Sequence, residues 1–156
     1  MQKDKYSTKL NKSCNFKYYS PDFEFPFEKV TSVWILVFQE DWKLICVEID
    51  RWIDIPGGHL HIDEAPIEAL KRECFEEAFI EIKNEKLVKV VESDYFWTEK
   101  EDLTYMLFYI WELDKKHDFI KNEESFARYE LTWKEFLNIY KWDKEFLKNV
   151  YWDYLN

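Results

Sequence analysis

Three glutamates in the middle of the chain have a spacing that would let them share one metal ion. Glu73, Glu76 and Glu77 lie within the segment Gly58–Ile80, which reads GHLHIDEAPIEALKRECFEEAFI. On a helix, residues three and four positions apart are neighbours, so the three carboxylates come within reach of one another. Like charges placed in this way repel, unless they bind a divalent cation together. Carboxylate oxygens are hard ligands that suit Mg²⁺ or Mn²⁺.

A metal ion held there would suit hydrolysis at phosphorus. It would bridge to substrate phosphates, neutralise their charge and lower the pKa of a bound water that attacks. Gly57 and Gly58 precede the predicted helix, where they allow close approach of the backbone and could offer a carbonyl oxygen as a ligand. An acidic triplet alone is usually a solvated helix face, so the surrounding residues decide the interpretation.

The same segment predicts the helix that positions these glutamates, over Glu64–Phe79. At about 100° per residue, an apolar arc faces the core and the acidic arc lies beside it. Either Asp63 caps the helix or the charge of Glu64 complements its dipole, and Pro66 is tolerated in the first turn. The apolar arc consists of Ile67, Leu70, Cys74 and Ala78.

Apolar runs around this helix predict the strands of a sheet. Tyr18–Phe27 is expected to be an extended edge segment or an arm, and Gln39–Asp41 a turn. The predicted strands are Val30–Phe38, Lys43–Ile49, Glu85–Ser93, Leu103–Leu113 and a short Arg128–Leu131, followed by amphipathic helices at Trp133–Tyr140 and Asp143–Leu155. We therefore expect an α/β fold with a mixed sheet flanked by helices. Residues 16–156 form one domain in this prediction, after a flexible segment at 1–15.

Composition narrows the class of protein. The chain of 156 residues carries a net charge of −10, which disfavours stable binding of nucleic acid. Three cysteines form no CxxC pair, and Cys46 and Cys74 lie in apolar surroundings, so a reducing cytoplasm is expected. There is neither an apolar run of membrane-spanning length nor a signal-peptide pattern, so no membrane association is expected.

The segment Gly58–Ile80 resembles the signature box of the Nudix pyrophosphate hydrolases. That pattern is Gly, five residues, Glu, seven residues, Arg-Glu, an aliphatic residue, any residue, Glu-Glu, any residue, Gly, and an aliphatic residue. Six positions match in identity and spacing: Gly58, Glu64, Arg72, Glu73, Glu76 and Glu77. Phe79 stands where the family has glycine. A glycine there ends the helix in a left-handed turn, so we expect the helix to end differently, with an effect on packing rather than chemistry.

The resemblance implies a Nudix-like α/β/α sandwich and a role for each box residue. Glu76 and Glu77 are expected to be the main metal ligands. Glu73 is expected to bind or orient the metal and is a candidate general base. The carbonyl of Gly57 is expected to complete the ligand shell, around Mg²⁺ or else Mn²⁺.

Other residues are assigned supporting roles by the same resemblance. Glu64 and Arg72 are expected to form a structural ion pair between loop and helix. Many family members add a glutamate from a later loop, and Glu123 and Glu124 lie in the corresponding place; we favour Glu124. His59 is expected either to contact a substrate phosphate or to pack in the loop.

Two further sets of side chains have the chemistry for binding a ligand. His59 and His61 could form half of a zinc site, but no cluster of Cys or His accompanies them. Some aromatic residues could stack on a nucleotide base, and the sequence does not select among Tyr18, Tyr19, Trp52, Tyr95 and Phe96.

The resemblance implies Mg²⁺-dependent hydrolysis of a pyrophosphate bond in a nucleoside diphosphate linked to another moiety. Nucleoside triphosphates, nucleotide sugars and dinucleotides are the small-molecule substrates to consider. The alternative is a catalytically idle Nudix-like domain that binds a nucleotide as a sensor, which the intact set of box glutamates disfavours. An RNA-decapping activity is disfavoured by the net charge. A homodimer is compatible with the resemblance.

Overall fold

The computed structural model describes residues 7–8, 15–50, 52–97, 102–141 and 143–155. Besides the one-turn helix η1 (Phe27–Lys29), its helices are α1 (Pro66–Ala78), α2 (Trp133–Ile139) and α3 (Lys144–Leu155). Its strands are β1 (Ser7–Thr8), β2 (Phe16–Tyr19), β3 (Val30–Phe38), β4 (Leu44–Ile49), β5 (Trp52–Asp54), β6 (Gly57–His59), β7 (Ile80–Ser93), β8 (Phe96–Trp97), β9 (Thr104–Lys116) and β10 (Ala127–Leu131).

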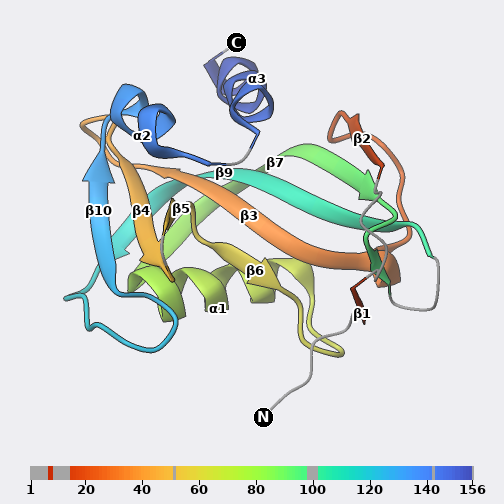
Figure 1. Cartoon of the computed structure of the whole chain (residues 1–156), viewed down its shortest axis with the longest axis horizontal. Coiled ribbons are helices and arrows are strands. Elements are labelled where there is room, and N and C mark those ends of the chain that lie inside the picture. Colours follow the sequence, from red (N-terminus) through yellow and green to blue (C-terminus); the bar gives the residue numbers. More distant parts are fainter. Residues whose placement is uncertain (1–6, 9–14, 51, 98–101, 142, 156) are drawn as a thin grey trace.

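An eight-stranded mixed sheet runs through the middle of the molecule (Figure 1). Its main path has the order β10-β4-β3-β9-β7-β2, with β5 paired to β4 and β6 paired to β3. Strands β3 and β9 are parallel, and the other pairs are antiparallel. Helix α1 covers one face, whereas α2 and α3 cover the other (Figure 1). The predicted α/β fold, a mixed sheet between helices, is therefore confirmed.

Strand β3 shows why both faces need a cover. Its residues are apolar almost without interruption, which is typical of a strand buried on both sides. Ile35 packs in the same core cluster as Leu70 of α1. Leu36, the next residue, packs in a second cluster with Phe136 of α2. Since successive side chains of a strand point to opposite faces, one apolar run supplies two cores.

Helix α1 begins later than its charged flank suggested. It starts at Pro66, and its N-cap is Ala65, which makes no side-chain capping hydrogen bond. The predicted capping by Asp63 is wrong, because Asp63 lies two residues before the cap and adopts a left-handed backbone with φ of 65°. Proline at the first helical position fixes the start, since its ring presets φ and the missing amide needs no partner.

The end of α1 corrects a second expectation. Phe79 adopts φ of 55° and ψ of 44°, which is the left-handed conformation that a glycine would take, and its amide donates to the Phe75 carbonyl at 3.0 Å. The prediction of a different helix end is therefore wrong. A side chain in this conformation costs about 1 kcal/mol. Ring contacts with Phe75 and Phe119, at centroid distances of 5.9 and 5.5 Å, offset that cost.

The long hairpin of β7 and β9 extends beyond the predicted strands. Strand β7 starts directly after Phe79 and pairs with β9 from Ile80, opposite Lys116, to Ser93, opposite Thr104. At the opposite end of the sheet from β10, β2 is an edge strand on β7, and of the extended segment predicted at Tyr18–Phe27 only Tyr18 and Tyr19 belong to it. Most of the predicted flexible segment 1–15 lies outside the described residues; its Ser7–Thr8 pair with β8. None of the described helices has the length and apolar character needed to cross a membrane.

Candidate active site

Two glycines in β6 make room for the carboxylates of α1. Neither has a positive φ, so their lack of a side chain matters for space rather than for backbone conformation. A Cβ on Gly57 would lie 2.4 Å from both the Trp34 ring and the Val33 carbonyl. A Cβ on Gly58 would lie 2.5 Å from Oε1 of Glu73. The expected close approach of the backbone is confirmed, and it brings β6 against one glutamate of the helix.

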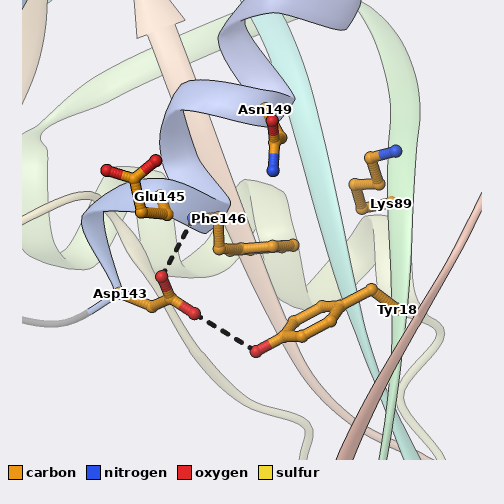
Figure 2. A pocket seen from close by; sticks show the side chains of 6 residues that line it. All are labelled: Tyr18, Lys89, Asp143, Glu145, Phe146 and Asn149. Atoms are coloured by element: carbon orange, nitrogen blue, oxygen red, sulfur yellow. Dashed lines mark hydrogen bonds between the residues drawn. The ribbon is translucent and has the colours of Figure 1, made fainter.

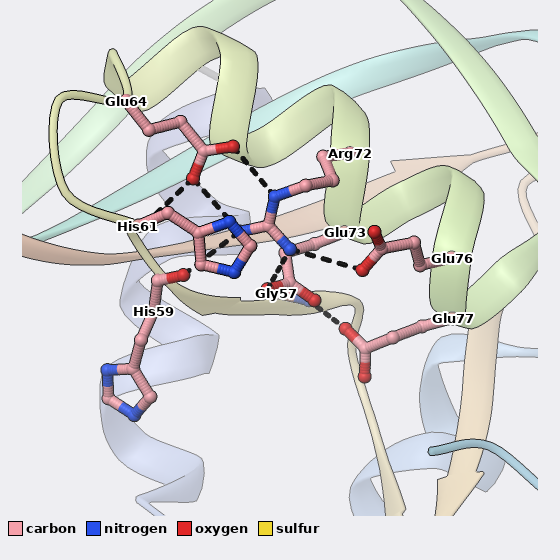
Figure 3. Close-up of polar contacts among 8 residues, drawn as sticks. All are labelled: Gly57, His59, His61, Glu64, Arg72, Glu73, Glu76 and Glu77. Carbon is pink, nitrogen blue, oxygen red and sulfur yellow. Dashed lines mark hydrogen bonds and ion pairs between the residues drawn. The ribbon is translucent and has the colours of Figure 1, made fainter. Parts of the chain in front are cut away.

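Arg72 ties the loop before the helix to the helix itself (Figure 3). Its Nε donates to Glu64 at 2.7 Å and its Nη2 donates to the other Glu64 oxygen at 3.0 Å, which makes a bidentate pair. Nη2 also donates to the carbonyl of His59 at 3.0 Å, and the amide of His61 donates to Glu64 at 2.9 Å. Burial acts to raise the pKa of Glu64, but the Arg72 and His61 hydrogen bonds lower it overall. The predicted pair of Glu64 with Arg72 is present.

Three carboxylates converge beside this pair. Nη1 of Arg72 donates to Glu73 at 3.0 Å and to Glu76 at 3.1 Å. Glu124 reaches the same place from the loop between β9 and β10, so that one oxygen from each of Glu73, Glu76 and Glu124 lies within 4.8 Å of the other two. Oxygen atoms on one divalent cation at about 2.0–2.6 Å are separated by distances of this size. The structure thus brings Glu124 to the helix, while Glu123 lines a groove next to it.

Glu77 has a different setting from the other two predicted ligands of α1. It is buried, and its Oε1 accepts the amide of Gly57 at 3.0 Å. Burial, together with the nearby charges of Glu73 and Asp54, raises the pKa of Glu77 to about 9 against the effect of the Gly57 hydrogen bond. The side chain of Glu77 therefore holds β6 in place, and its burial favours the protonated form as long as no cation is bound.

Burial also raises the pKa of Glu73, to about 7, while Arg72 opposes the shift and the charges of Glu76 and Glu124 add to it. A buried, unmatched carboxylate is costly, so such a group takes up a proton or pairs with a cation. The single guanidinium of Arg72 is shared among Glu64, Glu73 and Glu76. The site therefore has more acid than cation, which suits a divalent metal.

Asp54 is a buried carboxylate that sequence reasoning missed. It lies at the end of β5, is 5% exposed, and accepts the amide of Ile55 at 2.8 Å. Burial raises its pKa to about 6, although the hydrogen bonds from Ile55 and Trp52 act in the opposite direction. A lone charge between isoleucines, in the sequence Trp-Ile-Asp-Ile-Pro, was the available signal, because charged side chains are seldom buried without a purpose.

Two further residues that were not predicted from the sequence fix the loop that carries Glu124. Ser125 is fully buried, and its Oγ donates to the carbonyl of Glu77 at 2.7 Å. The side-chain oxygen of Asn122 accepts the amides of Glu124 and Ser125 at 2.9 and 3.0 Å. An Asn side chain that binds amides two and three residues onward is a common turn, and this spacing was the signal. These bonds fasten the loop to the end of α1.

His59 is placed mainly for packing. Its ring lies edge-on to Phe96, with centroids 5.1 Å apart, and points away from the carboxylates (Figure 3). Its backbone carbonyl, in contrast, is bound by Arg72. The geometry agrees with the packing role expected for this loop, and a contact of His59 with a substrate phosphate stays a prediction.

The comparisons of this chain with family models and with solved structures point to the same family. A family model described as the NUDIX domain matches residues 28–150. Among solved structures, a NUDIX hydrolase from Nitrosomonas europaea aligns with a TM-score of 0.61 at 18% identity over 81% of this chain and 88% of its own. A pyrophosphohydrolase from Bacillus subtilis aligns with a TM-score of 0.59 at 19% identity, over 76% of this chain and 70% of its own. A C. elegans Ap4A hydrolase aligns with a TM-score of 0.60 at 14% identity, over 81% of this chain and 97% of its own. No curated protein matches this chain significantly in sequence.

Proposed function

Because this chain belongs to the Nudix family, we propose that it hydrolyses a pyrophosphate bond in a nucleoside diphosphate linked to another moiety, with Mg²⁺ as cofactor and Mn²⁺ as a replacement. The observation that carries this proposal is the convergence of Glu73, Glu76 and Glu124, each of which brings one carboxylate oxygen to within 4.8 Å of the other two. The similar solved structures include a pyrophosphohydrolase and an Ap4A hydrolase, which supports this proposal.

The donor set fits a hard divalent cation. Glu73, Glu76 and Glu124 would hold it through carboxylate oxygens, and Glu77 would join them once it loses its proton. In a strand, the amide and the carbonyl of one residue point to the same side, so the Gly57 carbonyl faces the side on which its amide meets Glu77. When bound, the metal would neutralise phosphate charge and acidify a water.

The protein's own groups have separate tasks in this proposal. Arg72 and Glu64 keep the loop and helix in register, and the space left by Gly58 admits the carboxylate of Glu73. Two carboxylates, Glu73 and Glu124, are candidates for the base that takes a proton from the attacking water. A base works best when its pKa is close to the working pH, and burial brings Glu73 near that condition.

We also propose a cellular compartment and an oligomeric state for this protein. Cys46 and Cys74 are free, buried thiols in the structure, which supports the prediction of a reducing cytoplasm. The homodimer remains a prediction that sedimentation of the purified protein would check.

The direct test is a panel of nucleoside triphosphates, nucleotide sugars, dinucleoside polyphosphates and ADP-ribose, each incubated with the protein and Mg²⁺. The products would be separated by chromatography, with a chelator as the control for metal dependence. We expect at least one compound to be cleaved at its pyrophosphate bond only when Mg²⁺ is present. If one of them binds tightly and none is cleaved, the chain is an idle nucleotide-binding domain and the proposed function is wrong.

A further inference from the structure

A groove opens directly beside the carboxylate cluster. Its volume is about 470 Å³, which lies within the range of pockets that hold small molecules. It is lined by Phe75, Glu76, Phe79, Asn122, Glu123 and Glu124. Glu76 and Glu124 belong to the cluster as well, so the groove continues from the proposed metal site rather than forming a separate one.

One wall of this groove is aromatic. Phe75 is 48% exposed, although it lies among charged residues on α1, and Phe79 follows at the end of the same helix. The two ring centroids are 5.9 Å apart. The Phe75 ring also contacts His117 in a T-shaped arrangement, with ring centroids 5.9 Å apart. Two phenyl rings next to carboxylates present flat apolar surface where a solvated helix face would carry polar groups.

The rest of the lining includes a loop that is held in shape by hydrogen bonds. Asn122 binds the amides of Glu124 and Ser125, and Ser125 binds the carbonyl of Glu77. Glu123 lies between these anchored residues and makes no ion pair with the described part of the chain. A preformed wall lowers the ordering cost of binding a ligand.

We propose that this groove receives the aromatic base of a nucleotide whose phosphates lie at the carboxylate cluster, and this inference rests on the proposed function. The rings of Phe75 and Phe79 offer stacking surface for a planar base. The carboxylate of Glu123 accepts hydrogen bonds from N–H groups and repels anions. It therefore favours an amino-bearing base and excludes a second phosphate or a carboxylate from the groove.

The aromatic residues that the sequence offered for stacking do not all have this access. Tyr18 packs on Phe146 of α3, with ring centroids 4.8 Å apart (Figure 2). The hollow next to Tyr18 is lined by Lys89 and Asn149 among others and lies on the face of the sheet that α3 covers. A nucleotide with its phosphates on the α1 face cannot place its base there.

The test compares two non-hydrolysable probes that differ only by the nucleoside. Methylenediphosphonate and its adenosine ester would each be titrated calorimetrically, in the presence of Mg²⁺, into the wild-type protein and into Phe75→Ala. We expect the wild-type protein to bind the adenosine ester about tenfold more tightly than methylenediphosphonate. Phe75→Ala should lose that advantage and keep its affinity for methylenediphosphonate. Phe75→Tyr should keep the advantage, because a ring remains in place.

A matched control is Phe27→Ala, which removes another exposed phenyl ring, from η1, and should leave both affinities unchanged. Three results would overturn the inference while the proposed function stands: equal affinity of the wild type for both probes, an unchanged advantage in Phe75→Ala, or the same loss in Phe27→Ala. Binding of neither probe would overturn both. A concentration-dependent dimer that only Phe75→Ala abolishes would show instead that a second copy of the chain covers the groove.

Discussion

Two hollows with carboxylates lie on opposite faces of the sheet, and their acids are matched very differently. On the α3 face, Asp143 has a partner for each oxygen, since one accepts the amide of Phe146 at 3.0 Å and the other the hydroxyl of Tyr18 at 3.3 Å (Figure 2). On the α1 face, Glu73 and Glu76 share Arg72 with a third acid (Figure 3). Acidity alone therefore does not mark a binding site, whereas carboxylates that outnumber their hydrogen-bonding and charged partners do.

The largest expected effect is a loss of activity when an acid of the α1 face, but not the acid of the α3 face, is replaced. Glu76→Gln or Glu77→Gln should lower the rate of pyrophosphate hydrolysis by at least about 100-fold, because each removes a charge needed for the metal while keeping the shape of the side chain. Rates would be measured at saturating Mg²⁺, with circular dichroism to check the fold.

Asp143→Asn is the matched control on the other face. It should keep the wild-type rate and lose no more than about 1 kcal/mol of folding free energy, since asparagine also caps a helix. Unaltered rates in both glutamate variants would remove the metal assignment.

A smaller effect is expected where the loop of Glu124 is held. Ser125→Ala removes the hydrogen bond to the Glu77 carbonyl and leaves that buried group unsatisfied, at a cost of about 1–2 kcal/mol in stability. Since Ser125 acts through the position of Glu124, the Mg²⁺ concentration for half-maximal rate should rise about tenfold. Ser20→Ala, which removes an exposed hydroxyl near β2, should change neither value. A loss of stability with unchanged Mg²⁺ dependence would show that Ser125 is merely structural.

The pH dependence of stability should also tell the two hollows apart. Glu73 and Glu77 have pKa values raised from about 4.5 to about 7 and about 9. The metal-free native state therefore holds protons that the unfolded chain has released, and its stability falls as pH rises from about 4.5 to about 9.

Thermal unfolding should accordingly show a lower Tm at pH 8 than at pH 5 without metal, and Mg²⁺ should raise the Tm more at pH 8. Glu77→Gln should flatten the metal-free dependence, whereas Asp143→Asn should not. A metal-free Tm that rises over this range would contradict the burial of these carboxylates.

The smallest effect on metal binding is expected at Phe79. Phe79→Gly relieves the left-handed backbone, by about 1 kcal/mol, and removes a ring that packs on Phe75 and Phe119. Its Mg²⁺ dependence should match that of the wild type in a rate titration. A weaker response to Mg²⁺ in a well-folded Phe79→Gly protein would mean that this position also supports the metal site.

Features set by local pattern could be predicted from the sequence. The apolar run of β3 and the periodicity of α1 gave these elements almost to the residue, because both depend on spacing within one segment. The signature box predicted the ion pair between Glu64 and Arg72. The family resemblance predicted that Glu124 contributes to the site, and the structure places its carboxylate near that of Glu73.

Features that depend on contacts between distant parts of the chain could not be predicted from the sequence. The burial of Asp54 depends on the pairing of β5 with β4, and the second role of Glu77 depends on where β6 places the Gly57 amide. Ser125 lies 48 positions from its partner Glu77. The left-handed end of α1 at Phe79 is supported by ring contacts that include Phe119 from a distant loop.

The acids of the α1 face are proposed to bind a divalent metal, whereas the acid of the α3 face is not. Titration with Mn²⁺, followed by electron paramagnetic resonance, measures this without any assumption about the substrate. We predict that the wild-type protein and Asp143→Asn bind Mn²⁺ equally and that Glu76→Gln and Glu124→Gln bind it at least about tenfold more weakly. Equal binding by all four proteins, or no binding by the wild type, would contradict a metal site on the α1 face.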